Sequence, residues 1–294
     1  MHMNLFSEIC SVLDGAMVEY TTGNVAGADV IFIGEAAVIP VSIHAHSLEE
    51  AISSASRHKD SVSELVKLRG IYPLTIVEDR WRAQKQMMIS RLLAHAQIFT
   101  QLYARNCEVR KIDKRTAEEF LAENHSYGDA KCRYRYGLYL KRHTGHNASD
   151  NACEKIVPGT LVAVATFSNA RRWVKGDKTI RSYEWTRYAS LPGVRLSGGM
   201  GKLLSTFIEE VQPDDIMTYA DLEWSEGGVY KALGFALEGQ KEPVDFVIGS
   251  DWKRRALSGG HADSYHTGKT AKSEELYFRN SGSNKYRLKL TDYQ

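Results

Sequence analysis

The chain has 294 residues, of which 43% are hydrophobic and 25% are charged, as is ordinary for a soluble globular protein of one large or two smaller domains. Its formal net charge of +2 does not by itself indicate a polyanionic partner, so nucleic-acid binding has to be argued from local charge. The absence of an apolar run near the roughly 20 residues of a membrane span excludes a transmembrane helix.

The cysteines and the N-terminus favour a cytoplasmic protein. Cys10, Cys107, Cys132 and Cys153 have no C-x-x-C or other metal-ligand spacing, so we expect reduced thiols and no metal site. The first residues lack the basic region, apolar core and cleavage site of an export signal. We therefore expect no membrane contact and leave the oligomeric state open.

Strands and helices alternate in the first hundred residues, which predicts a small α/β layer. Ser47 is placed to cap a helix, because its hydroxyl can accept a bond from the free N–H groups of the first turn. The expected helices are Asn4 to Leu13, a segment beginning at Ser47, Val62 to Leu68 and Arg80 to Gln101. The expected strands are Met17 to Thr22, Asp29 to Ile33, Ala37 to His44 and Ile71 to Val77.

The next segment predicts a strand, a capped helix and an antiparallel pair of strands. Asp113 is placed to cap the helix Arg115 to Glu123, which follows the strand Cys107 to Ile112. The antiparallel pair is Tyr134 to Lys141 and Thr160 to Phe167. Their connection, Arg142 to Pro158, is rich in Asn, Gly, Ser, His and Asp and predicts an exposed loop.

A glycine-rich turn stands between a strand and a helix in the second half of the chain. The strand Ile180 to Ser190 mixes β-branched and aromatic residues with polar ones, and Leu203 to Ile208 has helical spacing. The turn between them includes Ser197, Gly198, Gly199, Gly201 and Lys202. After it come a strand (Asp215 to Asp221), a short helix (Ser225 to Leu233) ended by Gly234, and a strand (Phe235 to Gly249) bent at Pro243.

This turn suits a phosphate group. The first N–H groups of a helix have no internal partners and lie at the positive end of its dipole, and glycines allow close approach to the backbone. Lys202 could add a positive charge. Tight packing is the alternative reason for glycines at such a turn.

The same residues resemble the acetyl-CoA-binding core of the GNAT acyltransferases. The resemblance lies in Arg195-x-x-Gly198-x-x-Gly201 and in Val229-Tyr230-Lys231-Ala232-Leu233-Gly234-Phe235, although Met200 departs from the usual turn. A closer resemblance is to the phage GNAT-like domains of Mom-type DNA-modification enzymes and of Hef-like or Vsr-like homing nucleases. Its landmarks run from about residue 105 to 250, and include Asn124-His125-x-x-Gly128, Tyr183-Glu184-x-x-Arg187 and Tyr219-Ala220-Asp221-x-x-Trp224.

The N-terminal segment resembles the endonuclease domain of those nucleases through Arg69-Gly70-Ile71 and Glu78-Asp79-x-Trp81. Such nucleases hold a divalent cation with acidic residues on adjacent strands. Asp29 matches the first carboxylate, but Ser42 stands where the second is required. Glu35 could be a displaced replacement, and His44 and His46 resemble the paired histidines of Vsr-like proteins. We expect a degenerate domain retained for DNA binding or packing.

The predicted fold is therefore α/β (α+β), a GNAT fold preceded by a small degenerate restriction-endonuclease-like domain. The expected divisions are residues 1–102 for the nuclease-like domain with its bridging helix, 103–250 for the GNAT-like domain and 251–294 for a basic extension. From Trp252 to Gln294 there are nine Lys or Arg and four Asp or Glu, a balance of +5.

The resemblance implies roles for four residues in acyl transfer from acetyl-CoA or another acyl-CoA. Glu184 would be the base, Asp221 would orient or deprotonate an amine, Tyr230 would protonate the departing thiolate, and His125 would lie in the acceptor region. Arg195, Ser197, Gly198, Gly199, Gly201 and Lys202 would hold the cofactor. Structural roles remain the alternative: a strand carboxylate for Glu184, a helix cap for Asp221, a packed ring for Tyr230 and a structural imidazole for His125.

Basic and aromatic residues interleave in two stretches, which suits phosphate contact and base stacking. The candidate nucleic-acid contacts are Arg133, Arg135, Arg171, Arg172 and Arg187, with ordinary strand surface or an ion pair as the alternative. We expect an acyl-CoA-dependent N-acyltransferase acting on an amine of a nucleic-acid base, in a bacterial host if the protein is phage-encoded. The alternatives are a DNA-binding protein derived from a homing nuclease without transferase activity, and a small-molecule N-acetyltransferase.

Overall fold

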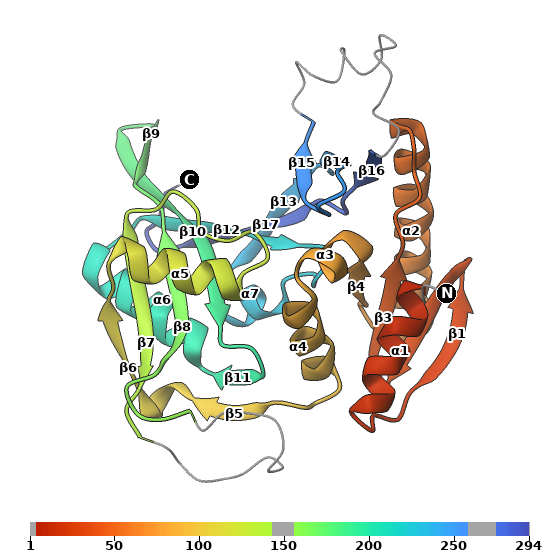
Figure 1. The fold of residues 1–294 in the computed structure, drawn as a ribbon. Coiled ribbons are helices and arrows are strands. Elements are labelled where there is room, and N and C mark those ends of the chain that lie inside the picture. The colour runs from red at the N-terminus through yellow and green to blue at the C-terminus, as the bar shows by residue number, and fades with distance from the viewer. Residues whose placement is uncertain (1–3, 143–155, 258–274, 294) are drawn as a thin grey trace. The chain divides into compact units, whose positions relative to one another are not determined.

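The computed structural model describes residues 4–142, 156–257 and 275–293 and shows a mixed α/β protein (Figure 1). The chain divides into two compact units. The first comprises residues 1–89, 220–227 and 239–284, and the second comprises residues 90–219, 228–238 and 285–294. The predicted mixed α/β class is confirmed.

The first unit contains a four-stranded sheet in the order β1-β2-β3-β4, antiparallel except for the parallel pair β3 and β4. Its strands are β1 (Thr21–Val25), β2 (Ala28–Ile33), β3 (Ala36–Val41) and β4 (Leu74–Val77). The helices are α1 (Leu5–Gly15), α2 (Leu48–Arg69) and α3 (Glu78–Ala83), with α4 (Lys85–His95) crossing into the second unit. Leu65 of α2 packs on Val30, Ala37 and Ile39 of the sheet.

Two helices of this region differ from the prediction. Ser47 caps α2 as expected, since its hydroxyl accepts the Glu50 N–H at 3.2 Å, but α2 then continues without a break to Arg69. Gly70 ends it in the left-handed conformation, with φ of 65°. The long helix expected from Arg80 to Gln101 is instead broken at Gln84, where φ is −134° and ψ is 40°.

The second unit is built on an eight-stranded sheet, with seven strands in the order β13-β17-β12-β10-β8-β7-β6 and β9 paired to β10 (Figure 1). The strands are β6 (Cys107–Lys111), β7 (Tyr134–Leu140), β8 (Leu161–Phe167), β9 (Arg171–Lys175), β10 (Lys178–Ser190), β12 (Asp215–Asp221), β13 (Ala236–Lys241) and β17 (Ser283–Lys289). The run from β6 to β10 is antiparallel, whereas β10 and β12 are parallel. Parts of β12, β13 and β17 are assigned to the first unit.

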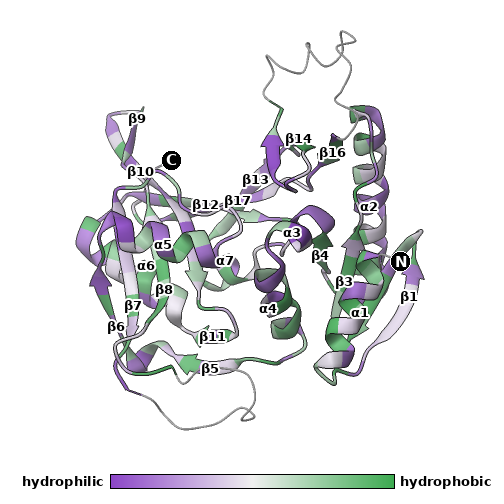
Figure 2. Cartoon of the chain, viewed as in Figure 1, coloured by the Kyte–Doolittle hydropathy of each residue, from purple (hydrophilic) through white to green (hydrophobic). Residues whose placement is uncertain are grey.

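Helices cover both faces of this sheet. On one face, Ala117, Phe120 and Leu121 of α5 (Lys114–Asn124) pack on Val164 and Ala189. On the other, Phe207 of α6 (Gly199–Val211) stacks on Phe167 of β8 with ring centroids 3.9 Å apart. The apolar character of β8, which is buried on both faces, is visible in Figure 2. We call these the α5 face and the α6 face.

The described residues of the predicted basic extension, 251–257 and 275–293, contribute strands to two sheets. β14 (Asp245–Ile248), β15 (Arg254–Ala256) and β16 (Leu276–Arg279) make a three-stranded antiparallel sheet of the first unit, while β17 enters the large sheet. The strand expected from Phe235 to Gly249 is interrupted around Pro243, where a bend was expected, and forms β13 and β14. The predicted loop Arg142 to Pro158 falls mostly on residues 143–155, which lie outside the described residues.

Candidate active site

The parallel strands β10 and β12 pair only over a short length. Their register joins Ser182 to Asp215, Tyr183 to Ile216 and Glu184 to Met217, and no main-chain pairing between them follows. Beyond this point the Thr218 hydroxyl donates to the Trp185 carbonyl at 3.1 Å. β10 itself continues to Ser190 in contact with β8. The two strands therefore part after Glu184, and among the described residues no strand pairs with the edge of β10 beyond that point.

A bulge lies at the point of parting. In the register with β8, Trp185 faces Phe167 and Arg187 faces Thr166, so Thr186 is an extra residue. Side chains alternate along a strand, and one extra residue reverses the order. Glu184 and Arg187 therefore share the α5 face.

Arg187 is held by main-chain oxygens on this face. Its Nε donates to the Gly128 carbonyl at 2.9 Å and its Nη1 donates to the Thr186 carbonyl at 2.8 Å. Burial lowers the pKa of its guanidinium, and the nearby carboxylates of Glu184 and Asp129 partly offset that effect. The Glu184 main chain is fixed as well, because its N–H donates to the Ser168 hydroxyl at 2.9 Å.

Two tyrosines occupy the α6 face beside the same gap. The Tyr230 ring, on α7 (Gly228–Ala232), lies 6.1 Å from the Trp185 ring. Burial raises the pKa of the Tyr230 phenol, and a hydrogen bond with Thr218 lowers it by a smaller amount. Burial also raises the pKa of Tyr188, and negative charge on Cys107 or Tyr230 would raise it further. Both phenols therefore stay protonated at neutral pH.

The glycine turn ends against Tyr188. Gly198 takes the left-handed conformation, with φ of 76°, as the residue before α6. Gly199 is buried, and a Cβ there would lie 2.6 Å from Leu196 Cδ2 and 3.2 Å from Tyr188 Oη. A Cβ at Gly201 would lie 3.4 Å from Leu233 Cδ2. Gly199 is thus required for close packing, which was the alternative reason for a glycine here.

The first turn of α6 has main-chain N–H groups that come before the first hydrogen bond of the helix. The Lys202 N–H donates to the Gly198 carbonyl at 3.0 Å, so the N–H groups of Gly199, Met200 and Gly201 come before that bond. They lie at the positive end of a helix of 13 residues. This geometry suits a phosphate.

Lys202 has a different role from the predicted phosphate contact. Its ammonium donates to the Ala104 carbonyl at 3.0 Å and to the Cys107 carbonyl at 2.5 Å, in and after the 3₁₀ turn η1 (Ala104–Asn106). These bonds direct its charge toward the chain itself. The prediction omitted Arg105, whose exposed side chain lies within this turn.

Arg195 and Ser197, the other predicted cofactor residues, lie on a strand of a separate two-stranded sheet. β11 (Val194–Ser197) pairs in parallel with β5 (Thr100–Tyr103). Gln101 Nε2 donates to the Ser197 hydroxyl at 2.9 Å, and the exposed Arg195 lies over the Phe99 ring at 5.2 Å. Ser197 and Arg195 therefore adjoin the start of α6.

Asp221 forms an ion pair instead of facing an open substrate site. Its Oδ2 lies 3.4 Å from Arg80 Nη2, and its Oδ1 accepts the Glu223 N–H at 3.0 Å. The expected cap of a helix at Ser225 is also absent, because α7 begins at Gly228. The structure thus favours a structural role for Asp221.

His125 ends α5 and fixes the loop that follows. Its Nδ1 accepts the Tyr127 N–H at 3.1 Å, and its carbonyl accepts the Gly128 N–H at 2.8 Å. The same loop provides the carbonyl that holds Arg187. His125 therefore shapes the α5 face of the gap.

The five predicted nucleic-acid arginines fall into two groups. Arg135 and Arg187 are partly buried and bond to main-chain carbonyls, with Arg135 Nη2 donating to Cys132 at 3.1 Å. Arg133, Arg171 and Arg172 are exposed. Only the exposed group offers its guanidinium groups freely to a large partner.

The predicted remnants of a nuclease site do not assemble around a metal. Asp29 is exposed and accepts a hydrogen bond from Asn24 at 3.2 Å, whereas Ser42 and His44 line a pocket with His58, Thr75 and Glu223. Among the described residues, no group of three or more His, Cys, Asp or Glu is placed to hold a metal ion. No helix in the part of the chain that the structure describes is long and apolar enough to cross a membrane.

Sequence reasoning missed Tyr188 and a buried ion network in the first unit. Tyr188 was obscured by the bulge, which changes the face on which it lies. In the network, Arg254 contacts Asp79 at 2.5 Å and Glu223 at 2.8 Å, and Arg80 Nε lies 3.1 Å from Glu223. These four residues come from three distant stretches, and no local pattern indicates that they contact one another.

No family model and no curated protein matches the chain. Among solved structures, it is similar to the NatC complex bound to Gag peptide and CoA, with 13% identity, a TM-score of 0.34 and coverage of 63% of this chain and 99% of that one. Nourseothricin acetyltransferase is 12% identical with a TM-score of 0.32, covering 63% and 99%. A GNAT-family acetyltransferase from Bacillus anthracis is 12% identical with a TM-score of 0.29, covering 63% and 95%. All three TM-scores are below 0.5.

Proposed function

We propose that this protein is an acyl-CoA-dependent N-acyltransferase of the GNAT type, acting in the cytoplasm on an amine of a nucleic-acid base. The observation that carries the proposal is the gap where β10 and β12 part. One carboxylate, Glu184, lies on its α5 face, and two protonated phenols, Tyr188 and Tyr230, lie on its α6 face. The gap also adjoins the N-terminus of α6.

The residues fit an acyl-CoA. The cofactor would supply the acyl group as a thioester, and the N–H groups of Gly199, Met200 and Gly201 would bind its pyrophosphate. Arg195 and Arg105, both exposed, would add positive charge in place of Lys202. The unpaired edge of β10 offers main-chain groups to the amide-containing arm.

The roles follow from the two faces. Glu184 would accept the proton that the amine loses as its nitrogen bonds to the acyl carbon. The carbon–sulfur bond breaks in the same transfer, and a phenol would give its proton to the departing thiolate. Tyr230 is the proposed donor, because its ring packs on Trp185 beside the gap. Tyr188 would orient the same group.

A nucleic-acid acceptor is supported by the charge around the α5 face. Arg133 is exposed one residue before β7, and its N–H donates to the Phe167 carbonyl at 2.8 Å. Ser168, next in the chain, bonds to Glu184. An exposed guanidinium near the base suits an acceptor that carries phosphates, while a small amine would not require it.

Calorimetric titration of acetyl-CoA into the purified protein is the first test. Gly201→Glu places a carboxylate in the first turn of α6 and is expected to weaken binding at least 10-fold by repelling the pyrophosphate. Ser205→Glu, one turn later at an exposed position, has the same charge and is the control. Absence of binding to the wild type would contradict the proposal and leave a DNA-binding protein without transferase activity.

The acceptor is tested by mass spectrometry of oligonucleotides and of small amines after incubation with acetyl-CoA. Transfer of an acetyl group to a base supports the proposed acceptor. Transfer to small amines alone would favour the small-molecule acetyltransferase instead.

A further inference from the structure

A two-stranded hairpin of β9 and β10 projects from the second unit (Figure 1). Its register joins Lys175 to Lys178 and Arg172 to Arg181 as direct cross-strand partners. Like charges placed directly opposite each other on neighbouring strands destabilise a sheet. Lys178 and Arg181 have partners within the chain, but these contacts do not account for Lys175 and Arg172 opposite them, and a ligand of opposite charge would.

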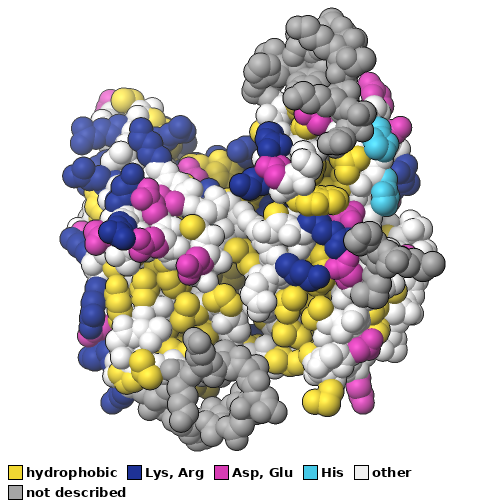
Figure 3. All heavy atoms as spheres, in the orientation of Figure 1, with side chains coloured by type: hydrophobic (Ala, Val, Ile, Leu, Met, Phe, Trp, Pro, Cys, Tyr) yellow, Lys and Arg dark blue, Asp and Glu magenta, His cyan; other side chains and the backbone are white. Residues whose placement is uncertain are grey.

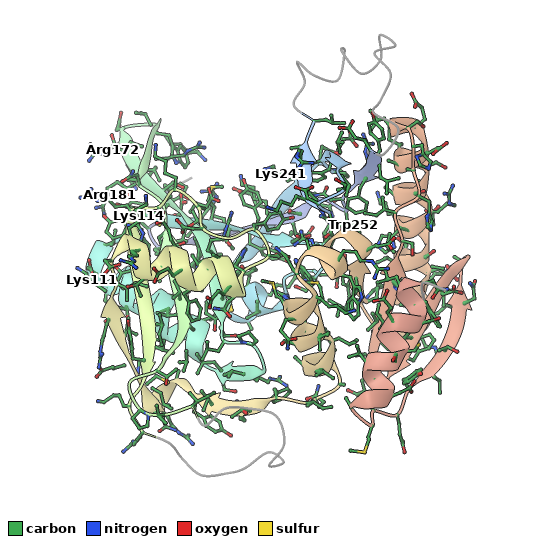
Figure 4. The ribbon with its side chains drawn as sticks, viewed as in Figure 1. Lys111, Lys114, Arg172, Arg181, Lys241 and Trp252 are labelled. Atoms are coloured by element: carbon green, nitrogen blue, oxygen red, sulfur yellow. The ribbon has the colours of Figure 1, made fainter. Side chains whose placement is uncertain are left out.

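The hairpin carries a strong positive charge. Residues 171–181 contain five Lys or Arg and one acidic residue, Asp177, which gives a balance of +4. Dark blue side chains gather over the hairpin in Figure 3, and Figure 4 labels Arg172 and Arg181 on its two strands. The local charge exceeds the +2 of the whole chain.

Two of these cations are held in place, and three extend into solvent. Lys178 Nζ donates to the Asp292 carbonyl at 2.9 Å, and Arg181 lies 3.5 Å from Asp214. Arg171, Arg172 and Lys175 are exposed, and within residues 4–142, 156–257 and 275–293 none of the three has an acidic partner. Three unneutralised cations therefore stand on a structured support.

The root of the hairpin adjoins the α5 face of the gap. Arg171 faces Ser182 in the register, two residues before Glu184. The Ser168 N–H donates to the Glu184 carbonyl at 2.9 Å, so the β8–β9 turn lies against the proposed base. Arg133 bonds to Phe167 at the same turn. Positive charge thus runs from the tip region of the hairpin to the site.

We propose that the hairpin cations Arg171, Arg172 and Lys175, together with Arg133, form a docking surface for the phosphate backbone of a nucleic acid. This deepens the proposed function, on which the choice of a nucleic acid rests. Arg171 and Lys175 are four residues apart on one face of β9, about 13 Å at the rise of a strand, so the two can reach different phosphates, and Arg172 extends from the other face of the same exposed hairpin. An anionic lipid surface fits less well, because the turn that would meet it carries the carboxylate of Asp177.

The test is fluorescence anisotropy with a labelled 20-nucleotide single strand and the matching duplex, over a series of salt concentrations. The triple variant Arg171→Glu, Arg172→Glu, Lys175→Glu is compared with Arg57→Glu, Lys59→Glu, Lys67→Glu, which makes the same charge change on exposed positions of α2. The milder Arg171→Gln, Arg172→Gln, Lys175→Gln variant guards against misfolding.

The hairpin variants are expected to bind at least 10-fold more weakly, with a salt slope smaller by about two to three, since each lost phosphate contact removes about 0.7–0.9 from it. The α2 variant should keep the wild-type slope. Equal losses in both triple variants, or binding to phosphatidylglycerol vesicles but to neither oligonucleotide, would overturn the proposal. Retained acetyl-CoA binding in the hairpin variants separates this result from failure of the acyl-CoA site.

Discussion

Glu184 and Arg187 lie on the same face of β10 because Thr186 is an extra residue in the register with β8. Without the bulge, residues three apart on a strand would point to opposite faces. The bulge therefore brings a carboxylate and a guanidinium to the side of the gap that α5 covers. Arg187 is bound to the Gly128 carbonyl, and Glu184 is the carboxylate that the proposed mechanism uses as the base.

Glu184→Gln should lower kcat for acyl transfer by about 10²- to 10³-fold, because an amide cannot accept the proton of the amine. The dissociation constant of acetyl-CoA should stay within about twofold of the wild-type value, since the substitution is on the α5 face. Steady-state kinetics and calorimetry measure the two quantities. Glu123→Gln, an exposed carboxylate on α5, is the control, and an equal loss in both variants would contradict the assignment.

Tyr230→Phe should lower kcat by at least about 10²-fold with little change in KM, because it removes a proton donor and keeps the ring. The pKa of this phenol is raised by burial, so in the wild type the protonated donor is retained at neutral pH and is lost only at alkaline pH. The wild-type pH–rate profile should therefore show no loss from this group below about pH 10.

Tyr188→Phe separates the two phenols. If Tyr188 only orients the reacting group, the variant should raise KM more than it lowers kcat. Tyr139→Phe, on β7 with its ring under Arg110, is the control for removing a hydroxyl. A larger kcat loss in Tyr188→Phe than in Tyr230→Phe would exchange the two roles.

Local pattern was enough to predict the strands that flank the site. The alternation from Ile180 to Ser190 and the short apolar stripe from Asp215 to Asp221 correspond to β10 and β12. The bulge at Thr186 could not be predicted, because it depends on the register with β8, about 20 residues away. Lys202 likewise finds its carbonyl partners more than 90 residues earlier in the chain. A charged residue beside a glycine turn has no local signal for such partners.

The strands of the N-terminal sheet in the first unit could be predicted, but not that later segments belong to the same unit. Apolar runs predicted β2, β3 and β4, and the strand expected from Phe235 to Gly249 includes β14, whereas β15 and β16 were not predicted. Arg254 on β15 connects this strand to the rest of the unit, since its guanidinium is 10% exposed and contacts Asp79 and Glu223, both 1% exposed. Burial of these charges depends on segments about 30 and 175 residues away.

Arg254→Met should lower the free energy of unfolding of the first unit by about 3–5 kcal/mol, because it leaves buried carboxylates with an incomplete set of partners. Glu223 in particular keeps a lowered pKa, since Arg254 and Arg80 outweigh its burial. Urea unfolding followed by tryptophan fluorescence measures the change. Arg255→Met breaks a surface pair, 57% and 41% exposed, and should cost less than about 1 kcal/mol. Similar losses in the two variants would contradict the importance of the network.

Glu8 on α1 should make the stability of the first unit depend on pH. Its burial would raise its pKa, but hydrogen bonds from Trp81, Arg82 and Lys85 prevail and lower the pKa from 4.5 to about 2. A carboxyl whose folded pKa is depressed stabilises the fold above its unfolded pKa, and this stabilisation is lost as the pH falls toward its folded pKa. Glu8→Gln should therefore be less stable than the wild type by about 1–3 kcal/mol at pH 7, and the difference should shrink between about pH 4.5 and 2. Urea titrations at pH 7, 4.5 and 3 measure this, with the exposed Glu19→Gln as control. A difference that stays constant over this range would assign the effect of Glu8 to packing instead of charge.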